Sequence, residues 1–178
     1  MTAPEYIQLK AFARTDGALL ALLWTTSFVC YVAGMSQPEL GMLALLLALV
    51  TPVFSLLRLK KFRDGVLEGI LSFGRGWAFT LLTFFYASLL FAVVNFVYFS
   101  YMDHGYFFDM LNKMMAAPEN VQILGKETMD SVSETLQQVR QMRPIDLALN
   151  IMMSNLMAGL IISIPVAALM KREARVNP

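Results

Sequence analysis

The residue types that commonly bind metals gather around the only histidine of the sequence. His104 lies beside Asp103 and near Asp109, and methionines follow it at positions 110, 114 and 115. Methionine thioethers suit Cu(I), and imidazole with carboxylates binds other metals. The alternative without a metal is a turn at the membrane interface whose methionines contact lipid. Since one histidine without a second ligand motif rarely forms a metal site, we predict no metal and no cofactor.

Sequence motifs of known enzyme classes are also missing. The chain contains no G-x-S-x-G, H-E-x-x-H or G-x-x-x-x-G-K-[ST] pattern. Its single cysteine excludes a disulfide framework and a thiolate metal cluster. We therefore expect no catalytic residues and no enzymatic activity.

Two asparagines are the polar residues that we expect deep in the membrane. Asn95 precedes Asp103 by eight residues, and Asn155 follows Asp146 by nine. If these acidic residues mark the outer ends of two spans, both amides lie roughly 12–13 Å inside. We expect them to face the bundle interior and to be in contact or to share a water. They then serve either as structural glue or as a polar pocket for a lipid headgroup or sugar.

The composition indicates that membrane helices position the candidate residues. Of the 178 residues, 57% are hydrophobic and only 15% are charged, and the net charge is +1. This excludes a soluble globular enzyme and a disordered chain, and the low net charge argues against nucleic acid as a partner. An integral membrane protein remains.

Uncharged runs predict four transmembrane helices, and no ionisable residue lies inside them. Because helices satisfy their own backbone in lipid, we predict an all-α membrane protein that forms a single four-span domain. The spans are expected near 17–35, 40–57, 77–101 and 147–170. Lysines and arginines concentrate between the second and third spans and after the fourth, which predicts cytoplasmic termini and an external 103–146 segment.

The two connecting segments are expected to be helical. Apolar residues recur every three or four positions in 58–76, which predicts an amphipathic cytoplasmic helix. Its basic residues are either a topology signal or contacts to anionic lipids: Arg58, Lys60, Lys61 and Arg63. The external segment predicts a helical hairpin, with one helix over 104–117 that Pro118 ends and a second over about 119–142.

A column of small residues marks the fourth span. Gly159, Ser163 and Ala167 are spaced by four, which lets another helix approach closely. The column packs either within one chain or along a homodimer seam.

The second half of the chain resembles the bacterial membrane family catalogued as domain of unknown function 4199. The likeness comprises the entry to the third span at Gly69, Ser72, Phe73 and Gly74, an external segment of about 40 residues from Tyr101–Asp103, and a small-residue final span ending at Met170–Lys171–Arg172. It implies a four-span protein of the inner membrane of Gram-negative bacteria and brings no catalytic residues.

Two functional hypotheses follow. The first is a non-enzymatic accessory or structural protein that associates with membrane lipids, with a copy of itself or with a membrane-protein partner. The second is a small transporter or flippase for an uncharged or lipid-linked substrate, with a polar path near Asn95 and Asn155. A continuous polar cavity favours the second hypothesis, and a solid apolar interior opposes it.

Overall fold

A computed structural model describes residues 3–117 and 126–172 as helices joined by short turns. Four helices of the described part are long and apolar enough to cross a membrane, and the third of them ends in a short π-helix. These are α1 (Ala3–Gly34), α2 (Pro38–Val66), α3 (Phe73–Val97) continued by η1 (Tyr98–Met102), and α7 (Pro144–Met170). The predicted all-α class with four candidate membrane helices is confirmed.

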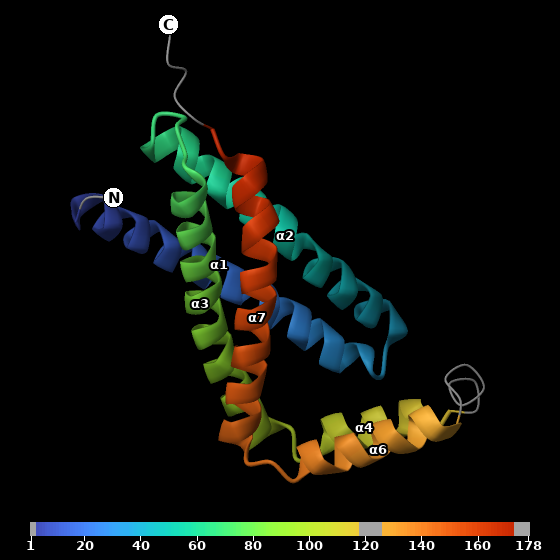
Figure 1. Cartoon of the computed structure of the whole chain (residues 1–178). Coiled ribbons are helices and arrows are strands. Elements are labelled where there is room, and N and C mark those ends of the chain that lie inside the picture. Colours follow the sequence, from blue (N-terminus) through green and yellow to red (C-terminus); the bar gives the residue numbers. More distant parts are fainter. Residues whose placement is uncertain (1–2, 118–125, 173–178) are drawn as a thin grey trace, which may run out of the picture.

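The four long helices form two pairs that diverge. The antiparallel hairpin α1–α2 and the antiparallel pair α3–α7 lie close together at one end and separate toward the other (Figure 1). We call the first the terminal end, because α1 begins and α7 ends there. The second is the hairpin end, where α4 (Tyr106–Met115) and α6 (Lys126–Arg140) lie across the bundle (Figure 1).

A closed apolar core fills the terminal end. Its buried side chains come from all four long helices and from the α2–α3 turn: Leu9, Ala13, Leu59, Phe62, Leu71, Phe79 and Val166. A backbone bridge between Leu71 and Arg172 ties this turn to the end of α7. The terminal end is therefore sealed by packing, whereas the hairpin end is splayed.

The predicted amphipathic connector over 58–76 is wrong. Residues 58–66 continue α2, and α3 already begins at Phe73. The chain turns between them at Glu68 and Gly69, which have φ values of 51° and 83°. Glycine adopts such left-handed values without steric cost, so Gly69 suits the turn. The helices extend beyond the predicted spans, because α1 includes Asp16 and α2 includes Arg58.

The described part of the segment after α3 contains the helices α4 and α6, in the two regions where the sequence predicts helices, and α4 is anchored to the bundle. Asp103 accepts hydrogen bonds from the backbone of Gly105 and Phe107 and from the Tyr98 hydroxyl. Phe107 then packs against Phe28 of α1. Pro118 and the start of the predicted second helix lie outside the described residues.

Candidate functional site

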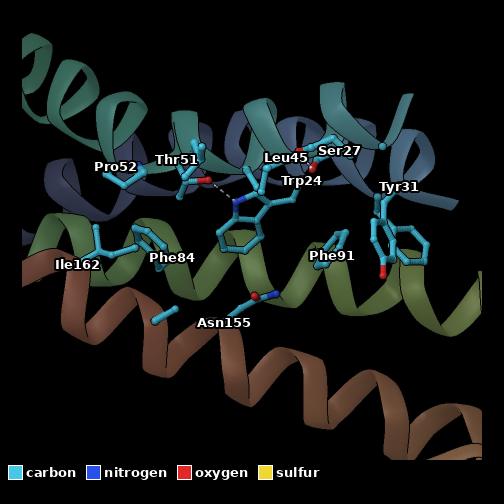
Figure 2. Close-up of a pocket in the computed structure, with 16 residues that line it drawn as sticks. Trp24, Ser27, Tyr31, Leu45, Thr51, Pro52, Phe84, Phe91, Asn155 and Ile162 are labelled. Atoms are coloured by element: carbon cyan, nitrogen blue, oxygen red, sulfur yellow. Dashed lines mark hydrogen bonds between the residues drawn. The ribbon is translucent and has the colours of Figure 1, made fainter. Parts of the chain in front are cut away.

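The divergence of the two helix pairs leaves a cleft of about 560 Å³ between them. Its walls are α2 and α7, and α1 and α3 supply residues from behind (Figure 2). The lining is almost entirely apolar and aromatic and includes Trp24, Phe28, Leu45, Leu49, Phe84, Phe91, Ala158 and Ile162. Its volume lies within the range of about 300–1,000 Å³ that is common for small-molecule sites.

Most polar groups in the cleft walls already have partners within the hairpin α1–α2. The Trp24 indole Nε1 donates to Thr51 Oγ1 at 3.0 Å, and Ser27 Oγ donates to the Ala44 carbonyl at 2.8 Å. Asn155 is the exception, because its Nδ2 is buried and has no hydrogen-bond partner among the described residues. Its carboxamide extends from α7 toward the middle of the cleft (Figure 2).

The predicted contact between Asn95 and Asn155 is wrong. Asn95 Nδ2 donates to the Phe91 carbonyl at 2.8 Å, and its Oδ1 has no partner among the described residues. The register of α3 against α7 explains the separation. Gly159 lies against Phe84, and Gly76 lies beside Ala167. The residue numbers of two positions that face each other on α3 and α7 therefore add up to 243. Asn155 is therefore level with position 88, about 10 Å along the bundle from Asn95, which is too far for one bridging water.

The small-residue column faces α3 inside the chain. Ser163 and Ala167 have no exposed surface, and a Cβ on Gly159 would lie 2.6 Å from Phe84 Cβ. The column therefore packs within one chain, and a homodimer seam built on it is wrong. Self-association through another surface stays a prediction.

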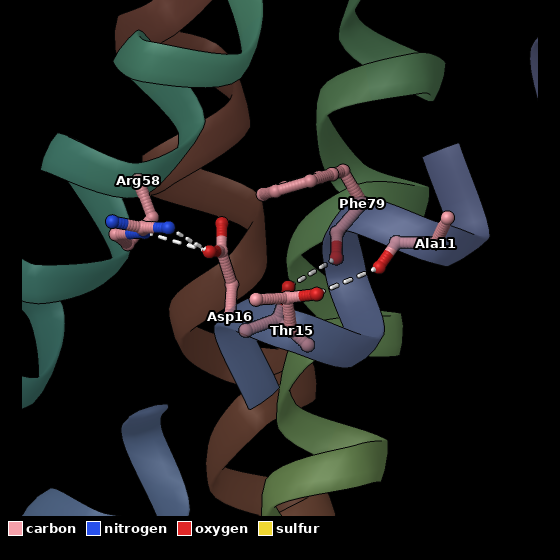
Figure 3. A network of polar contacts seen from close by, with 6 residues as sticks. Ala11, Thr15, Asp16, Arg58 and Phe79 are labelled. Carbon is pink, nitrogen blue, oxygen red and sulfur yellow. Dashed lines mark hydrogen bonds and ion pairs between the residues drawn. The ribbon is translucent and has the colours of Figure 1, made fainter. Parts of the chain in front are cut away.

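A buried ion pair joins α1 to α2 near the terminal end (Figure 3). The Asp16 side chain is 3% exposed, and its Oδ1 accepts hydrogen bonds from Nε (2.7 Å) and Nη2 of Arg58. The neighbouring Gly17 packs on α3 beside Thr83, eight residues past Arg75, which is about 12 Å along that helix. Charges at such depth in a membrane helix must be paired.

The ion pair was absent from the sequence prediction, although the sequence carries a signal for it. Asp16 and Arg58 bound the two uncharged runs and lie at nearly equal distances from the α1–α2 turn, where Gly34 meets Gly41. An antiparallel hairpin places such residues opposite each other. Trp24 and its hydrogen-bond partner Thr51 also lie at nearly equal distances from this turn.

The four basic residues predicted to contact anionic lipids do not form one set. Arg58 is committed to Asp16, and Arg63 bonds to Asp64 and to the Met170 carbonyl. Lys60 and Lys61 are exposed on α2. His104 belongs to no cluster of three or more potential metal ligands among the described residues.

Comparison with known proteins gives one match that covers most of the chain. A family model described as "Protein of unknown function (DUF4199)" matches residues 15–172. The match covers all four long helices except for the first turns of α1. No curated protein and no solved structure shows a significant match.

Proposed function

Because this chain belongs to the family of proteins of unknown function DUF4199, we propose its function from geometry: it is an integral membrane protein that binds a hydrocarbon chain of a lipid in the cleft between α2 and α7. The observation that carries the proposal is the apolar cleft of about 560 Å³ between membrane helices. The protein acts by this association, without catalysis, either alone or with a membrane partner.

Several features of the cleft support a lipid occupant. It lies between two helices that are long and apolar enough to span the bilayer, so in a membrane we expect it to border lipid rather than water. Its lining contains no charged residue among those that the structure describes. Burial of apolar surface stabilises a bound chain by about 25 cal/mol per Å².

The orientation that fits the charges places the terminal end in the cytoplasm. The described part of this end carries Arg58, Lys60, Lys61, Arg63, Arg75, Lys171 and Arg172. Short basic segments stay on the cytoplasmic side. We infer that both termini are cytoplasmic, that the α4–α6 hairpin is external and that the cleft widens into the outer half of the membrane. The family resemblance supports the inner membrane of a Gram-negative bacterium.

Cysteine labelling tests this orientation. In a Cys30→Ser background, Gln137→Cys in α6 is expected to react with a membrane-impermeant maleimide in intact spheroplasts, because α6 is external and position 137 is exposed. Lys61→Cys is the matched control and is expected to react only after permeabilisation. The opposite pattern would invert the topology.

Trp24 provides a direct measurement of cleft occupancy. In a Trp77→Phe chain, Trp24 is the remaining tryptophan and lies in the cleft wall. We expect lipid brominated along its acyl chains to quench its fluorescence. Filling the cleft by Ala158→Phe is expected to reduce that quenching to roughly half, because the larger ring takes the space of the bound chain.

The control for this measurement lies on the same helix. Ile161 is 67% exposed and does not line the cleft, so Ile161→Phe is expected to leave the quenching unchanged. Equal quenching in the chains with Ala158→Phe and with Ile161→Phe would show that the cleft takes up no lipid chain.

The transporter hypothesis receives less support. It requires a polar path past Asn95 and Asn155, but the two amides lie at different levels, and of the two Asn155 alone lines the cleft. At the terminal end, the path would meet the apolar core around Phe62 and Phe79. The geometry therefore favours binding over transport.

A further inference from the structure

The Asn155 carboxamide gives the cleft a chemical preference, and this inference rests on the proposed function. A polar group inside the membrane without a partner is costly, because lipid offers no hydrogen bonds. The hydrogen-bonding groups of Trp24, Ser27 and Thr51 are satisfied within the cleft wall. Asn155 Nδ2 is the buried donor of the described lining that has no partner.

A lone water does not solve this problem. A buried water is held by two to four polar partners, whereas the other residues of α3 and α7 that line the cleft are apolar: Phe84, Phe91, Ala158 and Ile162. A ligand atom must therefore supply the acceptor. A half-turn of the carboxamide exchanges its oxygen and nitrogen, so the donor can face the ligand without any movement of the backbone.

The depth of Asn155 limits where the acceptor lies on the ligand. Asn155 follows Asp146 by nine residues, which is about 13 Å along α7. The ester groups of an ordinary phospholipid stay at the membrane surface, so they do not reach this level when a chain enters the cleft lengthwise. The acceptor must lie part-way along the chain.

We propose that the cleft selects a hydrocarbon chain that carries a neutral oxygen near its middle, a hydroxyl or a keto group, and that Asn155 donates a hydrogen bond to it. Asn155 is then a specificity-determining residue. The absence of charged residues from the described cleft lining agrees with a neutral acceptor and opposes a charged group at this depth.

Competition against brominated lipid tests the preference. The Trp77→Phe chain is placed in vesicles of brominated phospholipid, and stearic acid or its mid-chain hydroxy and keto derivatives are added. Recovery of Trp24 fluorescence measures displacement. We expect half-recovery at about 2- to 12-fold lower concentration for the oxygenated chains, which is the effect of one net hydrogen bond.

Two variants make the result specific. With Asn155→Leu, the advantage of the oxygenated chains is expected to vanish while stearic acid still displaces the lipid, which shows that the cleft is intact. Ser154→Ala is the matched control, because Ser154 is exposed, bonds to the Asn150 carbonyl and does not line the cleft. It is expected to keep the preference.

The outcomes separate the two proposals. Equal displacement by all three chains in the parent protein overturns the role of Asn155 and leaves chain binding intact. An advantage that persists with Asn155→Leu also overturns that role. No displacement by any chain overturns chain binding itself.

Discussion

Replacement of Arg58 by methionine is expected to lower the free energy of unfolding by about 3–5 kcal/mol, because it leaves Asp16 buried without its partner. The Asp16 side chain is 3% exposed, and it is too short for its carboxylate to reach water. Methionine keeps most of the volume of the arginine stem, so the loss reports the charge pair and not a cavity.

The reverse replacement is expected to cost less. Asp16→Leu leaves Arg58, whose side chain is 23% exposed and long enough to extend toward the terminal end. The double variant is expected to recover much of the loss, because apolar replacement of a whole buried pair is often close to neutral. A double-mutant cycle then gives the coupling between the two residues.

Unfolding in mixed micelles by a denaturing detergent measures these differences. The matched control is Arg143→Met, which removes a similar pair to Asp146 in which the arginine side chain is 78% exposed. That change is expected to cost at most about 1 kcal/mol. A loss for Arg58→Met no larger than for Arg143→Met would mean that the Asp16–Arg58 pair does not hold α1 to α2.

Gly17→Ala is expected to destabilise the protein by about 1–3 kcal/mol, because the crossing of α1 and α3 leaves no room for a methyl group. A Cβ at this position would lie 2.6 Å from Tyr86 Cβ and 2.9 Å from the Thr83 carbonyl oxygen. A backbone oxygen cannot move aside as a side chain can, so α1 would have to shift away from α3.

Gly65→Ala is the control for this change. Gly65 also lies in a helix, but no atom lies within 4 Å of the place that a Cβ would take, so alanine is expected to be neutral or slightly stabilising there. The same micelle unfolding measures both variants. Equal stability of the two chains would contradict the close crossing at Gly17.

The sequence by itself determined the membrane class and the number of spans. Uncharged runs in a chain that is 57% hydrophobic predict helices that satisfy their own backbone in lipid, and four helices of the described residues are long and apolar enough to cross a membrane. The two described helices α4 and α6 between the third and fourth long helices also followed from local patterns. The family resemblance carried by Gly69, Ser72, Phe73 and Gly74 is confirmed by the match over residues 15–172.

Charge boundaries predicted two helix ends poorly, because α1 already begins at Ala3 and α2 continues to Val66. A run without charges shows which residues can lie in lipid. It does not mark where a helix ends, because charged residues can also be part of the same helix. Arg58 remains in α2 because Asp16 on α1 accepts its hydrogen bonds, and the helix breaks only before Gly69. Equal distance of the two charges from the turn is the pattern that predicts the pair.

Only the tertiary structure decided which residues meet across helices. The sequence placed Asn95 and Asn155 at equal depth, on the assumption that Asp103 and Asp146 lie level. The register of α3 on α7 is set instead by close packing at Gly159 and Gly76. The apolar core around Phe62 and Phe79 holds the two helix pairs together at the terminal end, and the pairs separate toward the hairpin end (Figure 1). The cleft therefore arises from contacts between helices that no single helix encodes.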